Sequence, residues 1–388
     1  MNTPSVLQPL SGVRIVEICN VAAGPYCAML LADLGADVVK LENPGSGDTL
    51  RAWPPHTGPD DDRLSENFAS LNRNKRSVVL DLKNPQQNAQ AKALIAAADV
   101  LIENNRPGVM RRLGLDFESL RQLNPKLIYC SISAYGQAGP RASEGGFDVT
   151  IQAVSGIMSV TGEADGPPVK CGVPVADFTA GLYGAMSICA QLRQVAQTGE
   201  GVHIDVPMMG TSLAIAALQT SEYFGVGRDP VKLGSAHPRN APYQAFRAKD
   251  DYLVMAAGTQ SLWETVCKIL QSPALLQDER FATTALRARN QVALKDLIEN
   301  ILQRDTAAHW IAAFSQAGVP CCPINSYSAV LADPQTLAMD WVQPLNMANG
   351  HQTKTVGTPL KFNGVAAPIA RPPPRLGEHN PEILGEIK

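Results

Sequence analysis

Short, strongly apolar segments rich in β-branched residues alternate with segments of helical periodicity through the first 140 residues. The apolar segments are too hydrophobic to leave one face exposed, so each predicts a strand of a buried parallel sheet. With the helical segments between them they form β-α-β repeats, which predict a doubly wound α/β domain. The predicted strands are 13–19, 36–41, 77–82, 99–103 and 127–133, and the predicted helices are 24–34, 84–97 and 108–123.

The length of 388 residues favours two domains, because single cores much beyond about 250 residues tend to divide. Strand-like residues 241–257, followed by mostly helical residues 261–303, predict a smaller α+β domain after a Gly- and Pro-rich linker. We therefore expect a large domain over 1–205, a linker over 206–240, a small domain over 241–310, and a segment over 311–388 that links back to the large domain.

Composition argues against several classes of protein. The net charge of −3 provides no basic face for nucleic acid. The N-terminal segment lacks the features of a secretory signal, and no stretch approaches the roughly 20 apolar residues of a membrane span, so we expect a cytoplasmic protein without membrane contact. Eight cysteines without CxxC spacing predict reduced core thiols, and six scattered histidines predict no metal site.

The loops that follow the predicted strands are the expected place for a ligand, because the crevice of a doubly wound sheet lies beyond the carboxyl ends of its strands. Their small, amide and basic residues suit a phosphate-bearing ligand, and ordinary turn chemistry explains them equally well. Neither GxGxxG nor GxxxxGK[ST] is present, and GxSxG and HExxH are also absent. The residues are Gly24, Asn43, Gly45, Gly47, Lys83, Asn104, Arg106 and Tyr135.

Asp177 lies where a long helical pattern begins, after Val173-Pro-Val-Ala. An aspartate at this place is most often an N-cap that accepts hydrogen bonds from the first-turn amides. The start of a helix also carries a partial positive charge. That charge would keep a partly dehydrated carboxylate ionised and therefore able to attack a thioester. Gly181 and Gly184 follow on this helix, and their cost there suggests close packing against a backbone or ligand.

A series of short motifs runs in order through the chain. It includes Leu10-Ser-Gly-Val-Arg-Ile-Val-Glu, Ala23-Gly-Pro, Leu34-Gly-Ala-Asp-Val-Val-Lys-Leu-Glu, Asn74-Lys-Arg-Ser, Glu103-Asn104, Pro107-Gly108, Arg112-Leu-Gly, Asp165-Gly-Pro-Pro, Asp177, Ala317-Gly-Val-Pro, Asp333-Pro and Leu376-Gly-Glu-His. In this order the motifs resemble the class III CoA transferases, the CaiB/BaiF family. That family includes formyl-CoA and carnitine CoA-transferases and the 2-methylacyl-CoA racemases.

The resemblance implies that Asp177 is the catalytic carboxylate, which forms a mixed anhydride with the acyl group and then an aspartyl-CoA thioester. It implies CoA and acyl-CoA as substrates, with no permanently bound cofactor and a small carboxylic acid as the acceptor. The implied CoA-binding residues are Ala22, Ala23, Asn43, Leu80, Lys83, Asn104, Asn105, Arg106, Arg112, Ser133, Tyr135 and Gly136.

Two of these positions depart from the family pattern, because Asn43 and Ser133 stand where some members carry Arg and Lys. Lys40, Lys75 or Arg76 could compensate for the missing phosphate contacts. The resemblance also implies an interlocked, ring-like homodimer in which each chain threads through its partner.

Two alternatives to CoA transfer remain. A racemase of the same family needs an acid and a base on opposite faces of the substrate, usually with a histidine in a Gly-His-Asp segment. Here that segment is Gly146-Phe147-Asp148, and phenylalanine cannot exchange a proton, so transfer is favoured. The third possibility is a non-catalytic CoA-binding protein in which Asp177 only caps its helix.

Overall fold

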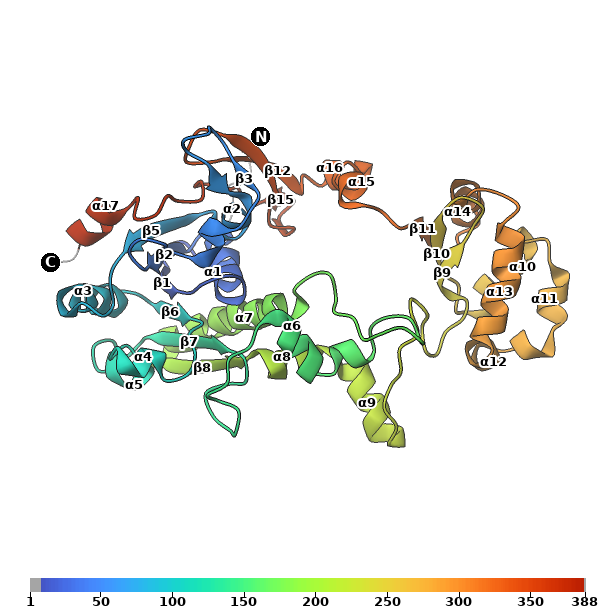
Figure 1. Cartoon of the computed structure of the whole chain (residues 1–388), viewed down its shortest axis with the longest axis horizontal. Helices are drawn as coiled ribbons and strands as arrows, with labels where there is room; N and C mark the ends of the chain where they lie inside the picture. Colours follow the sequence, from blue (N-terminus) through green and yellow to red (C-terminus); the bar gives the residue numbers. More distant parts are fainter. Residues whose placement is uncertain (1–7, 387–388) are drawn as a thin grey trace. The chain divides into compact units, whose positions relative to one another are not determined.

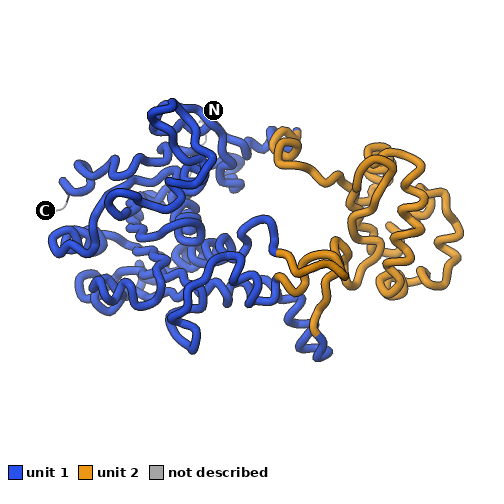
Figure 2. Tube along the Cα trace, viewed as in Figure 1, with its two compact units in different colours: residues 1–157, 170–228, 334–388 blue, residues 158–169, 229–333 orange. Residues whose placement is uncertain are grey.

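The computed structural model describes residues 8–386. They divide into two compact units, which Figure 2 distinguishes by colour. The first unit contains the residues up to 157, 170–228 and from 334 onward, and the second contains 158–169 and 229–333. The second unit is longer than the small domain predicted over 241–310, because β11 (Cys321–Pro323) pairs with β10 (Tyr252–Ala256).

A six-stranded sheet in the order β5-β2-β1-β6-β7-β8 lies at the centre of the first unit (Figure 1). All neighbouring strands are parallel, which confirms the predicted doubly wound α/β fold. The chain order reverses between β1 and β6, so the loops after these two strands diverge and leave a crevice between them. The strands are β1 (Arg14–Ile18), β2 (Asp37–Glu42), β5 (Lys75–Val79), β6 (Val100–Glu103), β7 (Ile128–Ser133) and β8 (Val202–Pro207).

Helices cover both faces of this sheet. Side chains such as Ile15 and Val100 face α1 (Ala23–Asp33), α6 (Asp148–Val154) and α7 (Val175–Thr198). Alternate side chains such as Val16 and Leu101 face the second layer. That layer contains α3 (Pro85–Ala96), α4 (Val109–Arg112), α5 (Phe117–Leu120) and α17 (Asn380–Gly385). Because both faces are buried, the inner strands lack polar alternation, whereas His203 and Asp205 of the edge strand β8 are exposed.

The single helix predicted over 108–123 is wrong. The segment forms α4 and α5, with Gly114 between them at φ 64°. A left-handed residue interrupts the helical backbone, and the Asp116 side chain then accepts a hydrogen bond from the Ser119 amide to begin α5.

The rest of the first unit consists of short helices and hairpins. Residues 208–226, expected to be part of a linker, form two helices that follow β8 directly. The C-terminal residues pack along β5, where Asn380 Oδ1 accepts a hydrogen bond from the Val79 amide at 2.8 Å. These elements are β3 (His56–Thr57), β4 (Leu64–Ser65), α2 (Glu66–Asn72), α8 (Met208–Ile215), α9 (Ala217–Val226), α16 (Pro334–Ala338), β12 (Val342–Asn346), β13 (Gln352–Val356), β14 (Lys361–Phe362) and β15 (Val365–Ala366).

The second unit has its own core, formed by an antiparallel sheet in the order β11-β10-β9 and by helices packed on it. Buried Arg287 binds the Ala241 and Phe281 carbonyls at 2.8 and 3.0 Å. The remaining elements are β9 (Tyr243–Arg247), α10 (Gln260–Ile269), α11 (Pro273–Gln277), α12 (Thr284–Arg289), α13 (Gln291–Leu302), α14 (Ala307–Gln316) and α15 (Tyr327–Leu331). Within residues 8–386, no helix is both long and apolar enough to cross a bilayer.

Candidate active site

Asp177 occupies the first turn of α7 and lines a cavity of about 210 Å³ in the first unit. The helix begins two residues before Asp177, with Pro174 in the N-cap position. The alternative in which Asp177 only caps its helix is therefore wrong, because Asp177 is not the N-cap and the Ala176 amide donates to Asp148 Oδ1 of α6 at 2.9 Å. Among the described residues, the Asp177 carboxylate has neither a hydrogen-bond partner nor an ion-pair partner.

The pKa of Asp177 is raised to about 7, chiefly because the half-buried carboxylate is desolvated and secondly because the charge of Asp148 lies nearby. This is opposite to the effect expected from the helix N-terminus alone. Asp148 is held in place by Gln152, whose Nε2 donates to Asp148 Oδ2 at 2.6 Å. Near neutral pH, Asp177 is therefore poised between its protonated and ionised forms.

Close packing between α7 and α1 fixes where Asp177 lies. A Cβ atom at Gly181 would come within 2.8 Å of the Ala23 carbonyl oxygen, and one at Gly184 within 3.0 Å of Cys27 Sγ. The rings of Tyr26 and Phe178 pack at 4.6 Å between centroids. The two glycines thus allow the close approach suggested by the sequence, and they bring the start of α7 against the start of α1.

The walls of the Asp177 cavity come from loops beyond the carboxyl ends of three strands. One wall follows β1, a second follows β6 across the switch point, and a third follows β7. The helix N-termini of α1 and α7 thus meet loops whose residues are mostly small or polar. The lining residues are Asn20, Val21, Ala22, Ala23, Asn104, Asn105, Arg106, Pro107, Ile132, Ser133, Ala134, Glu144, Gly145, Gly146, Phe147, Asp177 and Met208.

A second cavity of about 190 Å³ lies next to the first, and Asn20 and Asn105 line both. Its walls include Asn43 after β2 and Lys83 after β5, together with the apolar side chains of Leu82, Val109 and Leu113. Adjoining cavities with mixed polar and apolar walls can accommodate an elongated ligand that reaches Asp177 at one end.

The family model described as CoA-transferase family III matches residues 10–380. This chain belongs to CoA-transferase family III. The transferase is 41% identical to a succinate–glutarate CoA-transferase of Agrobacterium fabrum, with 99% of this chain and 97% of the relative aligned. It is 37% identical to a human succinyl-CoA:glutarate CoA-transferase over 98% of this chain and 86% of the relative.

A solved structure of a CaiB/BaiF family protein from Brucella suis has the same fold. Its TM-score to the transferase is 0.88 at 37% sequence identity, covering 98% of this chain and 99% of that one. The predicted family and fold are thus confirmed, and the chain is an enzyme of the CoA-transferase class.

The two cavities of the transferase bring together most of the residues predicted to bind CoA. Ala22, Ala23, Asn104, Arg106 and Ser133 line the Asp177 cavity, Asn43 and Lys83 line the second, and Asn105 lines both.

Four predicted residues line neither cavity. The Leu80 side chain is only 1% exposed in the core, so it offers no contact surface to a ligand. The Tyr135 hydroxyl accepts a hydrogen bond from Arg141 at 2.6 Å, and Gly136 lies beside Asp205. Arg112 lies exposed at the end of α4.

Lys40, Lys75 and Arg76 cannot compensate for Asn43 and Ser133, so that expectation is wrong. Lys40 and Lys75 are fully buried and each forms an ion pair with Glu17 at 2.8 Å. Arg76 is also buried and pairs with Asp37 and Glu382. All three cations are committed to the protein itself and are unavailable for a phosphate.

Sequence reasoning missed the roles of Asp148, Gln152 and Asn20. Asp148 was noticed only as part of the segment that distinguishes a racemase. Its contact with the Ala176 amide joins two successive α-helices through residues 28 positions apart, and no local pattern predicts such a contact.

Proposed function

We propose that Asp177 of this CoA transferase is the group through which CoA passes from an acyl-CoA donor to a free acid. Its carboxylate oxygen attacks the acyl-CoA carbonyl carbon, the C–S bond breaks, and CoA thiolate leaves a mixed anhydride. The thiolate then attacks the Asp177 carbonyl carbon and releases the donor acid. The acceptor carboxylate attacks the resulting aspartyl-CoA thioester, and the released thiolate takes the acceptor acyl group from the second anhydride, regenerating Asp177.

The observation that carries this proposal is the isolation of Asp177 inside its cavity. No cation neutralises the carboxylate among the described residues, and burial raises its pKa to about 7. A carboxylate of higher pKa is a stronger nucleophile, and about half of it is ionised at neutral pH. The same desolvation lowers the cost of converting the charged carboxylate into a neutral anhydride or thioester.

We propose that the two adjoining cavities bind CoA. Lys83, Arg106 and Arg112 are exposed and have no ion-pair partner among the described residues, so they can contact phosphates. Asn43, Asn104, Asn105 and Ser133 would supply polar contacts, Ala22 and Ala23 close backbone approach, and Tyr135 and Gly136 peripheral contacts, whereas the buried Leu80 would only support the loop that follows it. No bound cofactor is needed for the exchange, because acyl-CoA and acid supply both reacting groups.

A transfer assay tests this function and narrows the substrates. The relatives named for succinate and glutarate suggest succinyl-CoA as donor and a small dicarboxylic acid as acceptor. We expect chromatography to detect glutaryl-CoA when succinyl-CoA and glutarate are supplied together. We expect no deuterium exchange at the carbon next to the thioester. Phe147 lines the cavity and cannot exchange a proton, so exchange without transfer would contradict the proposal and favour the racemase.

We also propose that the enzyme is a homodimer of the interlocked kind. No residue of α9 is buried, and Leu218 and Phe224 are 62% and 83% exposed, which is unusual for large apolar side chains that lack a partner. Sedimentation should give a dimer, and a monomer at micromolar concentration would contradict this assignment.

Eight free cysteines suit a reducing compartment such as the cytoplasm, the location that we propose.

A further inference from the structure

Val21 has an unusual backbone conformation at the edge of the Asp177 cavity. Its φ angle is 66°, in the left-handed region that β-branched residues rarely enter. The residue lies between β1 and α1, and Asn20, Val21, Ala22 and Ala23 together line the cavity. The direction of the peptide groups in this wall therefore depends on a conformation that valine does not favour by itself.

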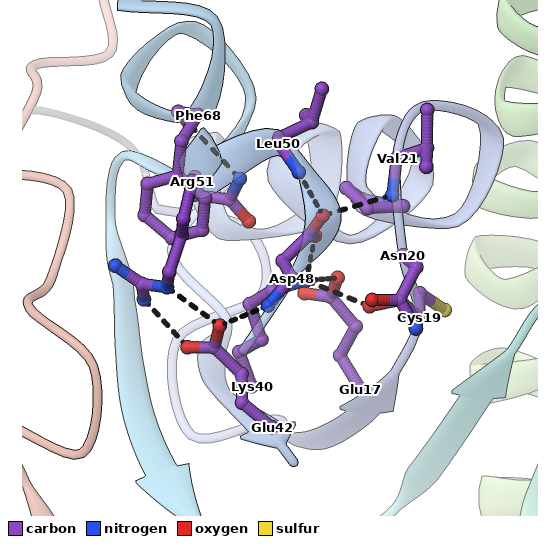
Figure 3. A network of polar contacts seen from close by, with 12 residues as sticks. Glu17, Cys19, Asn20, Val21, Lys40, Glu42, Asp48, Leu50, Arg51 and Phe68 are labelled. Carbon is purple, nitrogen blue, oxygen red and sulfur yellow. Dashed lines mark hydrogen bonds and ion pairs between the residues drawn. The ribbon is translucent and has the colours of Figure 1, made fainter. Parts of the chain in front are cut away.

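Two side chains from other loops hold this conformation. Asp48 Oδ1 accepts a hydrogen bond from the Val21 amide at 3.1 Å, as Figure 3 shows. The Asn104 side chain forms two hydrogen bonds with the Asn20 backbone. Its Oδ1 accepts from the Asn20 amide at 2.9 Å, and its Nδ2 donates to the Asn20 carbonyl at 2.8 Å. The Asn104 side chain is thus engaged with the wall of the cavity.

Asp48 is itself rigidly fixed. It is 1% exposed, and its Oδ2 forms an ion pair with Lys40 Nζ at 2.9 Å. Its backbone amide donates to Glu42 Oε2 at 2.9 Å, and its Oδ1 also accepts from the Leu50 amide at 2.9 Å. Both carboxylate oxygens of Asp48 and its backbone amide therefore have partners within the protein (Figure 3).

The cluster behind Asp48 reaches the same segment at two more points. Lys40 Nζ donates to the Cys19 carbonyl at 2.9 Å, just before the wall, and Lys75 Nζ donates to the Pro25 carbonyl at 2.9 Å, just after it. Both lysines pair with Glu17, so the two ammonium groups are balanced by the carboxylates of Glu17 and Asp48. Hydrogen bonds from Lys40 and Lys75 therefore hold both ends of the segment from Cys19 to Pro25. The two lysines and the two carboxylates together carry no net charge.

We propose that Asp48 is a positioning residue for CoA transfer, which holds Val21 in its left-handed conformation and so keeps the Asn20–Ala23 wall in place around the reacting groups. Asp48 lines neither cavity, so its effect on the reaction comes through the segment that it holds, chiefly through Val21, and not through contact with a ligand. The proposal rests on the proposed role of Asp177 as the reacting group. Loss of Asp48 would let Val21 relax to negative φ and turn its peptide groups away from their present directions.

A substitution cycle between Asp48 and Val21 tests this directly. Glycine adopts positive φ without strain, so Val21→Gly removes the need for the Asp48 contact. We expect Asp48→Ala to lower kcat by at least about tenfold in the wild-type background and by less than about threefold in the Val21→Gly background. Equal losses in the two backgrounds, or an unchanged kcat in Asp48→Ala, would overturn the proposal.

Asp33→Ala is the matched control for loss of a buried ion pair. Asp33 pairs with Arg73 at 2.7 Å and binds Asn74, which also has positive φ, but neither residue lines the Asp177 cavity. We expect Asp33→Ala to lower the unfolding temperature while kcat per folded molecule stays within about twofold. A loss of kcat equal to that of Asp48→Ala would show that general destabilisation explains both, and would overturn the proposal.

Asp48→Asn serves if Asp48→Ala does not fold. The asparagine oxygen can still accept from Val21 and Leu50, whereas the ion pair with Lys40 is lost. We expect kcat close to wild type with reduced stability, and a tenfold loss of kcat in a folded Asp48→Asn enzyme would contradict the role of the Val21 contact. An Asp177→Ala enzyme that still transfers CoA would instead contradict the proposed role of Asp177. The comparison of Asp48→Ala in the wild-type and Val21→Gly backgrounds would still test the role of Asp48, because it measures only turnover.

Discussion

Asp177 lines the cavity together with the Asn20–Ala23 wall, whereas Asp48 binds the Val21 amide of that wall without lining the cavity, and the surroundings of the two carboxylates differ. Asp48 receives an ammonium group from Lys40 and two backbone amides, from Val21 and Leu50. Asp177 receives no such partner within the described residues, and the nearby charge of Asp148 opposes its ionisation. The comparison teaches that one buried carboxylate is committed to shaping the wall, whereas the other is left free to change its charge and its bonds.

The cations follow the same division. Burial alone would lower the pKa of Lys40, but the carboxylates of Glu17, Asp48 and Glu42 outweigh it and raise that pKa. The neighbouring Lys75 has a lowered pKa, because burial outweighs the attraction of Glu17. Within the described residues neither lysine forms an ion pair with Asp177. The cluster therefore holds the wall in place without neutralising the reacting carboxylate.

The largest expected effect is that of Asp177→Ala. Removing the group that carries the acyl intermediate should lower kcat by at least about 10⁴-fold. The fold and the dissociation constant for CoA should change little, because the carboxylate caps no amide. Turnover and calorimetric CoA binding measure the two parts separately, and a folded variant with residual turnover near wild type would remove the distinction between Asp177 and Asp48.

The buried cluster should matter for stability in the way that Asp177 does not. Glu17→Gln leaves Lys40 and Lys75 with one buried carboxylate in place of two, which should cost about 3–5 kcal/mol of unfolding free energy. Denaturant unfolding followed in the first unit measures this loss. Glu118→Gln is the control, because its exposed pair with Arg121 should be worth less than about 1 kcal/mol. Equal costs would contradict the assigned importance of burial.

The pH dependence of stability should reveal the raised pKa of Asp177. An unfolded aspartate has a pKa of about 4, whereas that of folded Asp177 is about 7. The folded chain therefore holds an extra proton between these values, and this contribution to stability is lost as pH rises through the window. Relative to wild type, Asp177→Asn should gain stability as pH rises from about 4 to about 7. A constant difference between the two proteins would contradict the raised pKa.

A smaller effect is expected from Asp148→Asn. Removing this charge should lower the pKa of Asp177, because Asp148 disfavours its ionisation. Transfer needs ionised Asp177, so the rising limb of kcat/KM against pH should move to lower pH. Glu144→Gln is the control, since Glu144 also lines the cavity but pairs with Arg141. An unmoved limb in Asp148→Asn would show that Asp148 acts only by capping α7.

The sequence predicted the parts of the fold that depend on local pattern. The strands of the central sheet lie within a few residues of their predicted limits, because runs covered on both faces have a distinctive composition. The two glycines of α7 correctly indicated a close helix contact. The family resemblance, confirmed by the full-length match, directed attention to Asp177.

The helix predicted over 108–123 failed for a local reason, the left-handed Gly114, whereas the other errors involve contacts between residues far apart in the sequence. Lys40 and Lys75 were candidates for phosphate binding, because a lysine near a strand end gives no sign that Glu17 will neutralise it inside the sheet. The sequence left the capping alternative for Asp177 open, because no local pattern shows that Asp148 from α6 binds the Ala176 amide instead. The left-handed Val21 was not predicted, since valine disfavours that conformation and only tertiary contacts impose it.

Intact-protein mass spectrometry is the most direct test of Asp177 as the carrier. The enzyme would be incubated with a panel of acyl-CoAs that includes succinyl-CoA, treated with hydroxylamine, and digested for peptide mapping. We predict a CoA adduct on the protein before treatment and a hydroxamate at Asp177 after it, both absent from Asp177→Ala. Catalytic transfer without either modification, or a modification at another residue, would contradict the account.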